Sequence, residues 1–219
     1  CASAELVGDR RVSRDDARAA ATAASDQTLT IDAEPVVVNE VNRLVATPEG
    51  RAFTKRALER MRTHEAFVNA KLDEAHLPRQ LAAIPIVESG YENLGAAGSE
   101  SLSGRSLAPG IPGRGLWMFI PTTARAYGLR VNDDTDERLD IEKETGAAMR
   151  LLSELVHAFG DVRLALAAYN QGQRHVHEAI AREGTRDAWE LVRRGALNRY
   201  APQVYAAAIV MSNPDLIER

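Results

Sequence analysis

Apolar residues recur at steps of three and four positions along most of this chain, which is the spacing of an α-helix with one buried face. A first stripe of this kind consists of Val37, Val38, Val41, Leu44 and Val45. A second follows the "TPEG" segment and covers residues 50–76 at mixed three- and four-residue steps. Both stripes predict helices that pack against a common core.

The stretch "IPIVESGYENL", residues 84–94, brings a carboxylate to the end of an apolar run. The pattern predicts a helix from Pro78 to about Gly90, and Pro85 makes this helix short or kinked because proline cannot donate the helical hydrogen bond. Apolar surroundings and the negative end of a helix both disfavour a charged carboxyl group. We therefore expect Glu88 to have a raised pKa and to be a candidate proton donor.

Residues 93–114 are dense in Gly, Ser and Pro and predict a long loop with room for a short β element. A loop of this length in a compact domain is usually functional or mobile. Helical spacing then resumes in the segments 121–128, 140–160, 161–172, 173–182, 187–194 and 201–212. Asp140 and Gly160 are the expected caps of the longest of these helices.

These segments predict a mainly α fold. Residues 1–34 carry an apolar face made almost entirely of alanine, and we interpret them as an N-terminal arm or tether. Residues 35–219 then form the folded domain.

The composition excludes several classes of protein. The 219 residues are 45% hydrophobic and 26% charged, as in an ordinary soluble globular protein. A net charge of -4 gives no electrostatic basis for binding nucleic acid, which calls for a basic face. No apolar run approaches the roughly 18 residues that a membrane-spanning helix needs.

The single cysteine is Cys1, so a disulfide framework and a cysteine metal cluster are both excluded. Either Cys1 marks an arbitrary sequence boundary, or it is the lipidation site of a processed bacterial lipoprotein, which would then meet a membrane only through its lipid. The histidines do not form a ligand set, and "GIPGRG" lacks the Lys-Ser/Thr pair of a phosphate loop. We therefore expect no metal and no other cofactor.

Four separated segments carry candidate chemistry: "VESGY" (87–91), "GLWMFIPTTARAYGL" (115–129), "LALAAYNQG" (164–172) and "NRYAPQVYAAAI" (198–209). In this order they resemble the lytic transglycosylases of bacterial cell walls, in particular the membrane-bound lytic murein transglycosylase D type. The resemblance extends over most of the predicted domain. It implies a lysozyme-like helical domain of the goose-type lysozyme or SLT kind, with leading helices at 35–77, a core at 78–212 and the long loop beside the cleft.

The resemblance implies cleavage of peptidoglycan between N-acetylmuramic acid and N-acetylglucosamine by one catalytic acid, Glu88. This residue protonates the linking oxygen and then takes a proton from the C6 hydroxyl, so that a 1,6-anhydro end forms without water. Such an enzyme acts on glycan strands in the bacterial periplasm or cell envelope. Lipid on Cys1 would anchor it to the outer membrane.

Further site residues follow from the same resemblance. Tyr169 is expected beside the acid, where its hydroxyl reaches the sugar or Glu88. Tyr200 is expected in the groove, where it stacks on or hydrogen-bonds a sugar ring, and a half-buried packing role is the alternative. Asn170 is a substrate-side residue that is also expected to fasten backbone near the end of its helix.

The serines of the acid region are also candidates. Ser89 belongs to the substrate-side residues and is expected to support the turn at Glu88. Ser99 or Ser101 takes the place of a family serine that contacts the N-acetyl group. Trp117 is expected to pack in the core behind the acid.

The chain departs from the family pattern at several substrate-side positions. Met118 replaces a glutamine, and methionine lacks the strong donor and acceptor that an amide offers to the glycan. Ala196 stands where an acid is frequent, and Gln171 stands where a small residue is usual. The loop is longer than in the family, so that residues 95–114 can extend the groove, cover it or bind an envelope protein. These differences predict an active enzyme with altered glycan recognition.

Two other functions stay open from the sequence. One is a catalytically weak or inactive peptidoglycan-binding protein of the envelope. The other is a hydrolytic muramidase, which needs a second carboxylate to activate water. The candidates for that carboxylate are Glu92, Glu100, Asp133, Asp134 and Asp136.

Overall fold

The computed structural model describes residues 11–95 and 113–218. The α-helices are α1 (Arg14–Ala24), α2 (Pro35–Val45), α3 (Pro48–Met61), α4 (Glu65–Glu74), α5 (Ile84–Ser89), α6 (Pro121–Ala126), α7 (Ile141–Phe159), α8 (Val162–Gln171), α9 (Gln173–Glu183), α10 (Ala188–Arg193) and α11 (Tyr200–Ser212). Short 3₁₀ helices are η1 (Arg79–Ala83), η2 (Glu137–Leu139) and η3 (Pro214–Ile217). The predicted mainly α fold is confirmed.

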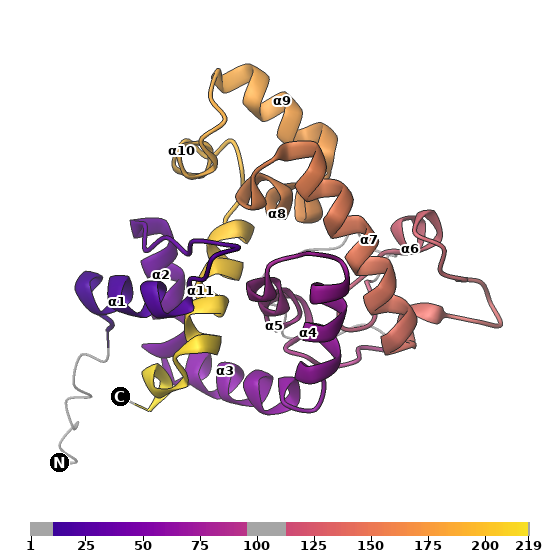
Figure 1. Ribbon diagram of the computed structural model, residues 1–219, viewed down its shortest axis with the longest axis horizontal. Helices are drawn as coiled ribbons and strands as arrows, with labels where there is room; N and C mark the ends of the chain where they lie inside the picture. Colours follow the sequence, from indigo (N-terminus) through magenta and orange to yellow (C-terminus); the bar gives the residue numbers. More distant parts are fainter. Residues whose placement is uncertain (1–10, 96–112, 219) are drawn as a thin grey trace, which may run out of the picture.

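The C-terminal helix α11 is the centre of the packing. Every residue from Tyr200 to Val210 is buried, and a helix that is apolar on all sides is a core helix rather than a surface one. It contacts α1 and α2, and also η1, α5 and α8. Figure 1 shows α11 running between the α1–α2 pair and the helices around α5. Helix α11, which carries the last sequence motif, therefore contacts both the N-terminal helices α1 and α2 and the helix α5.

The N-terminal segment differs from the expected arm. The face of α1 formed by Ala17, Ala20, Ala21 and Ala24 is buried, and α1 contacts α11 and α2. Small alanine side chains let the two helix backbones approach closely, and Asn213 donates from Nδ2 to the carbonyl of Ala20 at 3.0 Å. From residue 12 onward this segment is thus packed on the domain.

The apolar stripe over residues 50–76 forms two helices and not one. Helix α3 ends at Met61, and α4 begins at Glu65 after a tight turn. Mixed three- and four-residue spacing cannot reveal a turn of so few residues between two helices with similar buried faces. This turn lets α4 pack against η1 and α7, which a continuous helix could not reach.

The approach to the acid is short, as predicted. A 3₁₀ helix, η1, leads directly into the six-residue helix α5. Pro85 lies in the first turn of α5, where an N–H group has no helical partner and its absence costs nothing. Gly90 ends the helix in the left-handed conformation, with φ of 62°. The predicted helix end at Gly90 is thus confirmed, whereas Pro85 lies at the start of a separate short helix and not inside one that begins at Pro78.

The predicted long loop lies largely outside the described residues. At its two ends, isolated antiparallel bridges join Leu94 to Gly115 and Arg114 to Phe119. Beyond it, α7 begins at the side-chain cap of Asp140, which accepts from the N–H of Lys143 at 3.1 Å, and ends at Gly160. The predicted caps of this helix are confirmed.

Candidate active site

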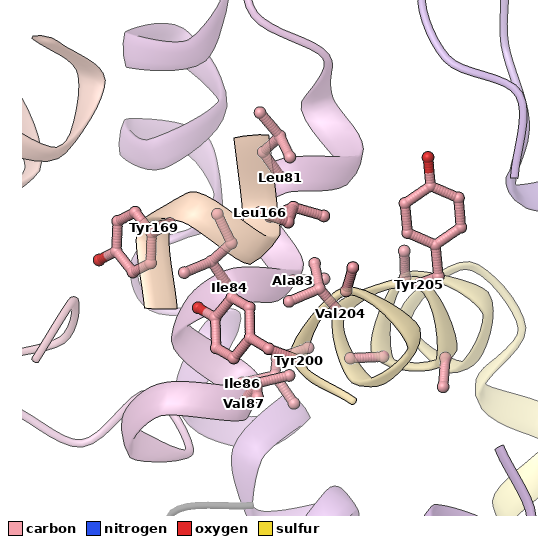
Figure 2. Packing of buried hydrophobic residues seen from close by; sticks show 14 of the residues in the cluster. Leu81, Ala83, Ile84, Ile86, Val87, Leu166, Tyr169, Tyr200, Val204 and Tyr205 are labelled. Carbon is pink, nitrogen blue, oxygen red and sulfur yellow. The ribbon is translucent and has the colours of Figure 1, made fainter. Parts of the chain in front are cut away.

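Glu88 lies in the last turn of α5 and is fully buried. The apolar residues Ile84, Ile86 and Val87 of the same short helix are buried with it. Figure 2 shows these three side chains close to the ring of Tyr200. The apolar approach to this carboxylate is therefore present in the fold.

Tyr200 is the hydrogen-bond partner of the acid. Its hydroxyl donates to Oε1 of Glu88 at 2.7 Å. The ring is 1% exposed at the start of α11, so it faces the acid here and not an open groove. From the sequence, Tyr200 is expected to meet a sugar or to pack half-buried, and the hydroxyl of Tyr169 is expected to reach the sugar or Glu88.

Tyr169 couples the acid to a second segment. Its ring stacks on that of Tyr200 with centroids 6.1 Å apart and planes at 15°. Its hydroxyl donates to the carbonyl of Trp117 at 2.7 Å. Helices α8 and α11 thus bring the two motif tyrosines together beside α5, as Figure 2 shows.

Side chains from α5, α7 and α8 form hydrogen bonds with the backbone of Leu116 and Trp117. Glu144 accepts from the N–H of Leu116 at 2.8 Å and from that of Trp117 at 3.1 Å. Ser89 donates to the carbonyl of Leu116 at 2.9 Å. Because its hydroxyl is buried and bonded in this way, Ser89 supports the Leu116–Trp117 turn, and in this structure it faces no open surface. The turn therefore links α5, α7 and α8.

The indole of Trp117 is fully buried, as predicted, and its Nε1 donates to Oγ1 of Thr145 at 3.0 Å. Gly115 precedes it with φ of 81°. A Cβ atom at Gly115 would lie 2.2 Å from the carbonyl oxygen of Arg138 and 2.3 Å from the carboxyl group of Glu144. Only glycine fits at this point.

Met118 has a left-handed backbone conformation, with φ of 56°, and is 6% exposed. Non-glycine residues adopt this conformation rarely, and strained positions of this kind cluster at functional sites. Tyr91, three residues after the acid, is also left-handed with φ of 57°. Both sequence segments around the acid therefore contain a strained residue.

Glu144 is a site residue that lies outside the four sequence motifs. Burial raises the pKa of its carboxyl well above the usual value, while the N–H groups of Leu116, Trp117 and Phe119 and the charge of Arg138 act in the opposite direction. A signal was present, because Glu144 lies four residues before Ala148 on the apolar stripe of α7. A carboxylate on the buried face of a helix needs partners, and here they are backbone donors.

A partly buried cluster of ion pairs lies next to the same turn. Asp136 contacts Arg114 at 2.8 Å and Arg138 at 2.7 Å. The guanidinium of Arg138 lowers the pKa of Asp136 and also donates to the carbonyl of Phe119 at 3.1 Å. Asp136 is thereby committed to structure, which argues against its role as the second carboxylate of a muramidase.

The side chain of Asn170 bonds another side chain near the end of α8, and not the backbone as expected. Its Oδ1 accepts from Nδ2 of Asn198 at 2.7 Å, and Oε1 of Gln171 accepts from the N–H of Asn198 at 2.9 Å. Asn198 in turn accepts from the N–H of Tyr200 at 3.0 Å. The unusual Gln171 thus helps to place Tyr200.

The other candidate acids that the structure describes lie at the surface. Glu92 pairs with Arg60 at 3.1 Å and is 53% exposed, and both Asp133 and Asp134 are exposed. Cys1, Ser99, Glu100 and Ser101, as well as most of the 95–114 segment, lie outside the described residues.

Metal and membrane features can be assessed over residues 11–95 and 113–218. In these two ranges, no group of three or more His, Cys, Asp or Glu side chains is arranged to hold a metal ion. No helix among them has the length and apolar character needed to cross a membrane.

Comparison with known proteins decides the family. The family model described as "Transglycosylase SLT domain" matches residues 65–192, which is more than half of the chain. The chain belongs to the transglycosylase SLT domain family. Its expected lysozyme-like helical fold is therefore confirmed.

Named relatives of this SLT domain come from bacteria and a phage. "Membrane-bound lytic murein transglycosylase D" of Escherichia coli K12 is 30% identical over 152 residues, which are 67% of this chain and 31% of the relative. "Peptidoglycan transglycosylase gp16" of Escherichia phage T7 is 46% identical over 61 residues, which are 27% of this chain and 5% of the relative. The chain thus spans less than a third of the length of either relative.

Proposed function

We propose that this SLT domain is a lytic transglycosylase that cleaves the bond between N-acetylmuramic acid and N-acetylglucosamine in peptidoglycan. The observation that carries the proposal is the buried Glu88, hydrogen-bonded by Tyr200 and linked through Ser89 to the Gly-Leu-Trp turn. The family match and the names of the relatives support the substrate class.

In the first step Glu88 acts as a general acid. Burial disfavours the charged form of a carboxyl group, so that a proton is available for the leaving glycosidic oxygen. The bond from C1 to that oxygen breaks, and the N-acetyl carbonyl of the substrate meets the developing positive charge. The hydrogen bond from Tyr200 steadies the carboxylate that remains.

In the second step the same carboxylate acts as a general base. It takes the proton of the C6 hydroxyl, and O6 closes on C1 to give a 1,6-anhydro end. Glu88 ends protonated, as it began, and no water is consumed. One carboxyl group therefore suffices for the whole reaction.

The fully buried state of Glu88 sets a condition on this mechanism. A glycosidic oxygen must come within about 3 Å of the carboxyl to receive its proton. Binding of the glycan must therefore displace the groups that cover Glu88 in this structure.

The hydrolytic alternative is less well supported. An inverting muramidase needs a second carboxylate roughly 6.5–9.5 Å from the acid, and a retaining one needs it closer. Of the described candidates, Glu92 and Asp136 pair with arginines, and Asp133 and Asp134 are exposed. A non-catalytic wall-binding role would leave the burial of Glu88 and its bond to Tyr200 without a purpose.

Digestion of defined peptidoglycan tests the proposal. The wild type is expected to release anhydro-muropeptides, whereas Glu88→Gln, which keeps the shape of the side chain, releases none. Glu92→Gln is the matched control, because it removes a surface carboxylate four residues away, and it is expected to retain activity. A product heavier by about 18 Da, from water addition, would establish hydrolysis instead, and binding without any soluble product would establish the wall-binding role.

The finer features of the site belong to the same proposal. We infer that Met118 alters recognition of the glycan, toward a modified peptidoglycan, and that residues 95–114 contact the glycan or an envelope protein. Ser99 or Ser101 would meet the N-acetyl group. Each of these assignments can be tested by substitution in the digestion assay.

We further propose that the protein works in the periplasm or cell envelope, where peptidoglycan lies, anchored to the outer membrane by lipid on Cys1. Replacing Cys1 by Ser should move the protein from the membrane fraction to the soluble fraction. Retention in the membrane fraction would contradict the lipid anchor.

A further inference from the structure

We propose that Glu144 is a positioning residue for the reaction, which acts on Glu88 through the Leu116–Trp117 turn. This inference rests on the proposed transglycosylase function. Glu144 is fully buried near the start of α7, and both of its carboxyl oxygens accept from consecutive backbone N–H groups of the turn.

The contact uses both oxygens of the Glu144 carboxyl group. Two adjacent N–H donors need two acceptor oxygens, which a carboxyl group offers, whereas an amide has one oxygen and one donor group. Gly115 leaves the space in which the carboxyl lies, since a Cβ there would be 2.3 Å from it. Both residues thus belong to one arrangement.

The turn is bonded on its other side to the groups that hold the acid. The carbonyl of Leu116 accepts from Ser89, the chain neighbour of Glu88. The carbonyl of Trp117 accepts from Tyr169, whose ring stacks on Tyr200, the donor to Glu88. A shift of the turn therefore displaces both supports of the acid together.

Glu144 itself faces the turn and not the acid. Its expected effect is therefore on the rate of the bound complex, with little effect on substrate affinity. A buried carboxylate with a merely structural role would lower stability and leave the rate constant of the folded enzyme unchanged.

The test compares Glu144→Gln with the wild type and with Thr54→Val. Thr54 is a buried residue of α3 whose hydroxyl donates to the carbonyls of Leu44 and Gly50, neither of which belongs to the turn. The measurements are kcat and KM on defined peptidoglycan, together with hydrogen exchange of the Leu116 and Trp117 amides. We expect Glu144→Gln to lower kcat about tenfold or more, because small displacements of catalytic groups have large rate costs, while KM changes less than about twofold. Amide exchange at one or both turn positions should accelerate about tenfold, as expected for a lost hydrogen bond.

Several outcomes would overturn the role of Glu144. One is a folded Glu144→Gln enzyme with kcat within about twofold of the wild type, with or without faster exchange. Another is an equal fall in kcat in Thr54→Val, which would make the effect a general consequence of lost stability. If Glu144→Gln does not fold, Glu144→Asp keeps both oxygens one methylene further away and should lower kcat at unchanged KM, and a wild-type kcat would contradict the proposal. A wild type that releases no anhydro product would instead overturn the proposed function itself, so the two failures are distinguishable.

Discussion

The hydroxyl of Tyr200 donates a 2.7 Å hydrogen bond to Oε1 of Glu88, although 112 positions separate the two residues. One partner ends a six-residue helix, and the other begins the core helix α11. The catalytic assignment of Glu88 therefore depends on contacts made by the last helix of the domain.

Replacing Tyr200 by Phe removes this donor and keeps the ring that stacks on Tyr169. A donor that faces a carboxylate favours its charged form, so its loss should make the acid hold its proton more tightly. We expect kcat to fall about tenfold, the equivalent of roughly 1.4 kcal/mol, and the alkaline limb of the pH–rate profile to move to higher pH. Steady-state kinetics across pH measures both effects.

Tyr205 supplies the matched control on the same helix. It is also buried, and its ring packs edge-on against Trp189 with centroids 5.1 Å apart. Tyr205→Phe should leave kcat and the pH profile as in the wild type. Equal changes in both variants would disprove a specific role for Tyr200.

Gly115→Ala should destabilise the domain. The new Cβ would meet the carbonyl of Arg138 and the carboxyl of Glu144 at a position with φ of 81°. Left-handed strain and steric overlap together should cost about 2–5 kcal/mol. Gly184→Ala has similar strain, with φ of 67°, but meets no atom within 4 Å, and should cost only about 1 kcal/mol. Chemical denaturation of both variants measures the difference, and equal losses would show that the space at Gly115 has no energetic role.

The ionised carboxyl group of Glu137 should stabilise the fold at neutral pH, and this stabilisation should be lost in acid. The side chain and N–H of Arg130, together with Lys143, lower the pKa of Glu137 from 4.5 to about 2. Because the folded pKa lies below the unfolded one, the stabilisation is present above pH 4.5 and is lost as the pH falls toward 2. Glu137→Gln should therefore be less stable than the wild type at pH 7, and the difference in Tm should vanish near pH 2. A difference in Tm that is independent of pH would contradict this account.

Met118→Gln restores the amide that the family pattern has at this position. The buried amide needs partners, so we expect a loss of about 1–3 kcal/mol in stability. If Met118 alters recognition, the variant should also have a lower KM for unmodified peptidoglycan than the wild type. An unchanged KM on both modified and unmodified substrate would place Met118 outside glycan recognition.

Local features of the fold could be predicted from the sequence because each has a local cause. Asp140 and Gly160 bound α7 through their own backbone and side-chain geometry, and Gly90 ends α5 in the same way. The burial of Glu88 likewise followed from the apolar run that precedes it. These are properties of a few neighbouring residues. The start of α5 was not predicted, because the sequence places Pro85 inside a helix that begins at Pro78.

The partners of the site residues could not be predicted in this way. Tyr169 lies in the last turn of α8 and Tyr200 is the first residue of α11, and only the packing of these helices decides which hydroxyl reaches the acid. The position of Glu144 on an apolar stripe indicates that its carboxyl group is buried. Its backbone partners could not be predicted, because they lie 28 and 27 positions away. The alanine face of α1 suggests an arm because alanine carries little apolar surface, but small side chains also permit the close packing that α1 shows.

The burial of α11 at the centre of the core has a consequence for when the domain can fold during synthesis. Ribosomes build chains from the N-terminus, and domains complete their folding only when the necessary segments have emerged. Of the α-helices described in this domain, the one that fills its centre and supplies the hydroxyl for Glu88 is synthesised after all the others. A nascent chain that still lacks Tyr200–Ser212 has neither the hydroxyl that bonds Glu88 nor the central helix of the core. Cleavage of glycan should therefore begin only after synthesis of this helix is complete.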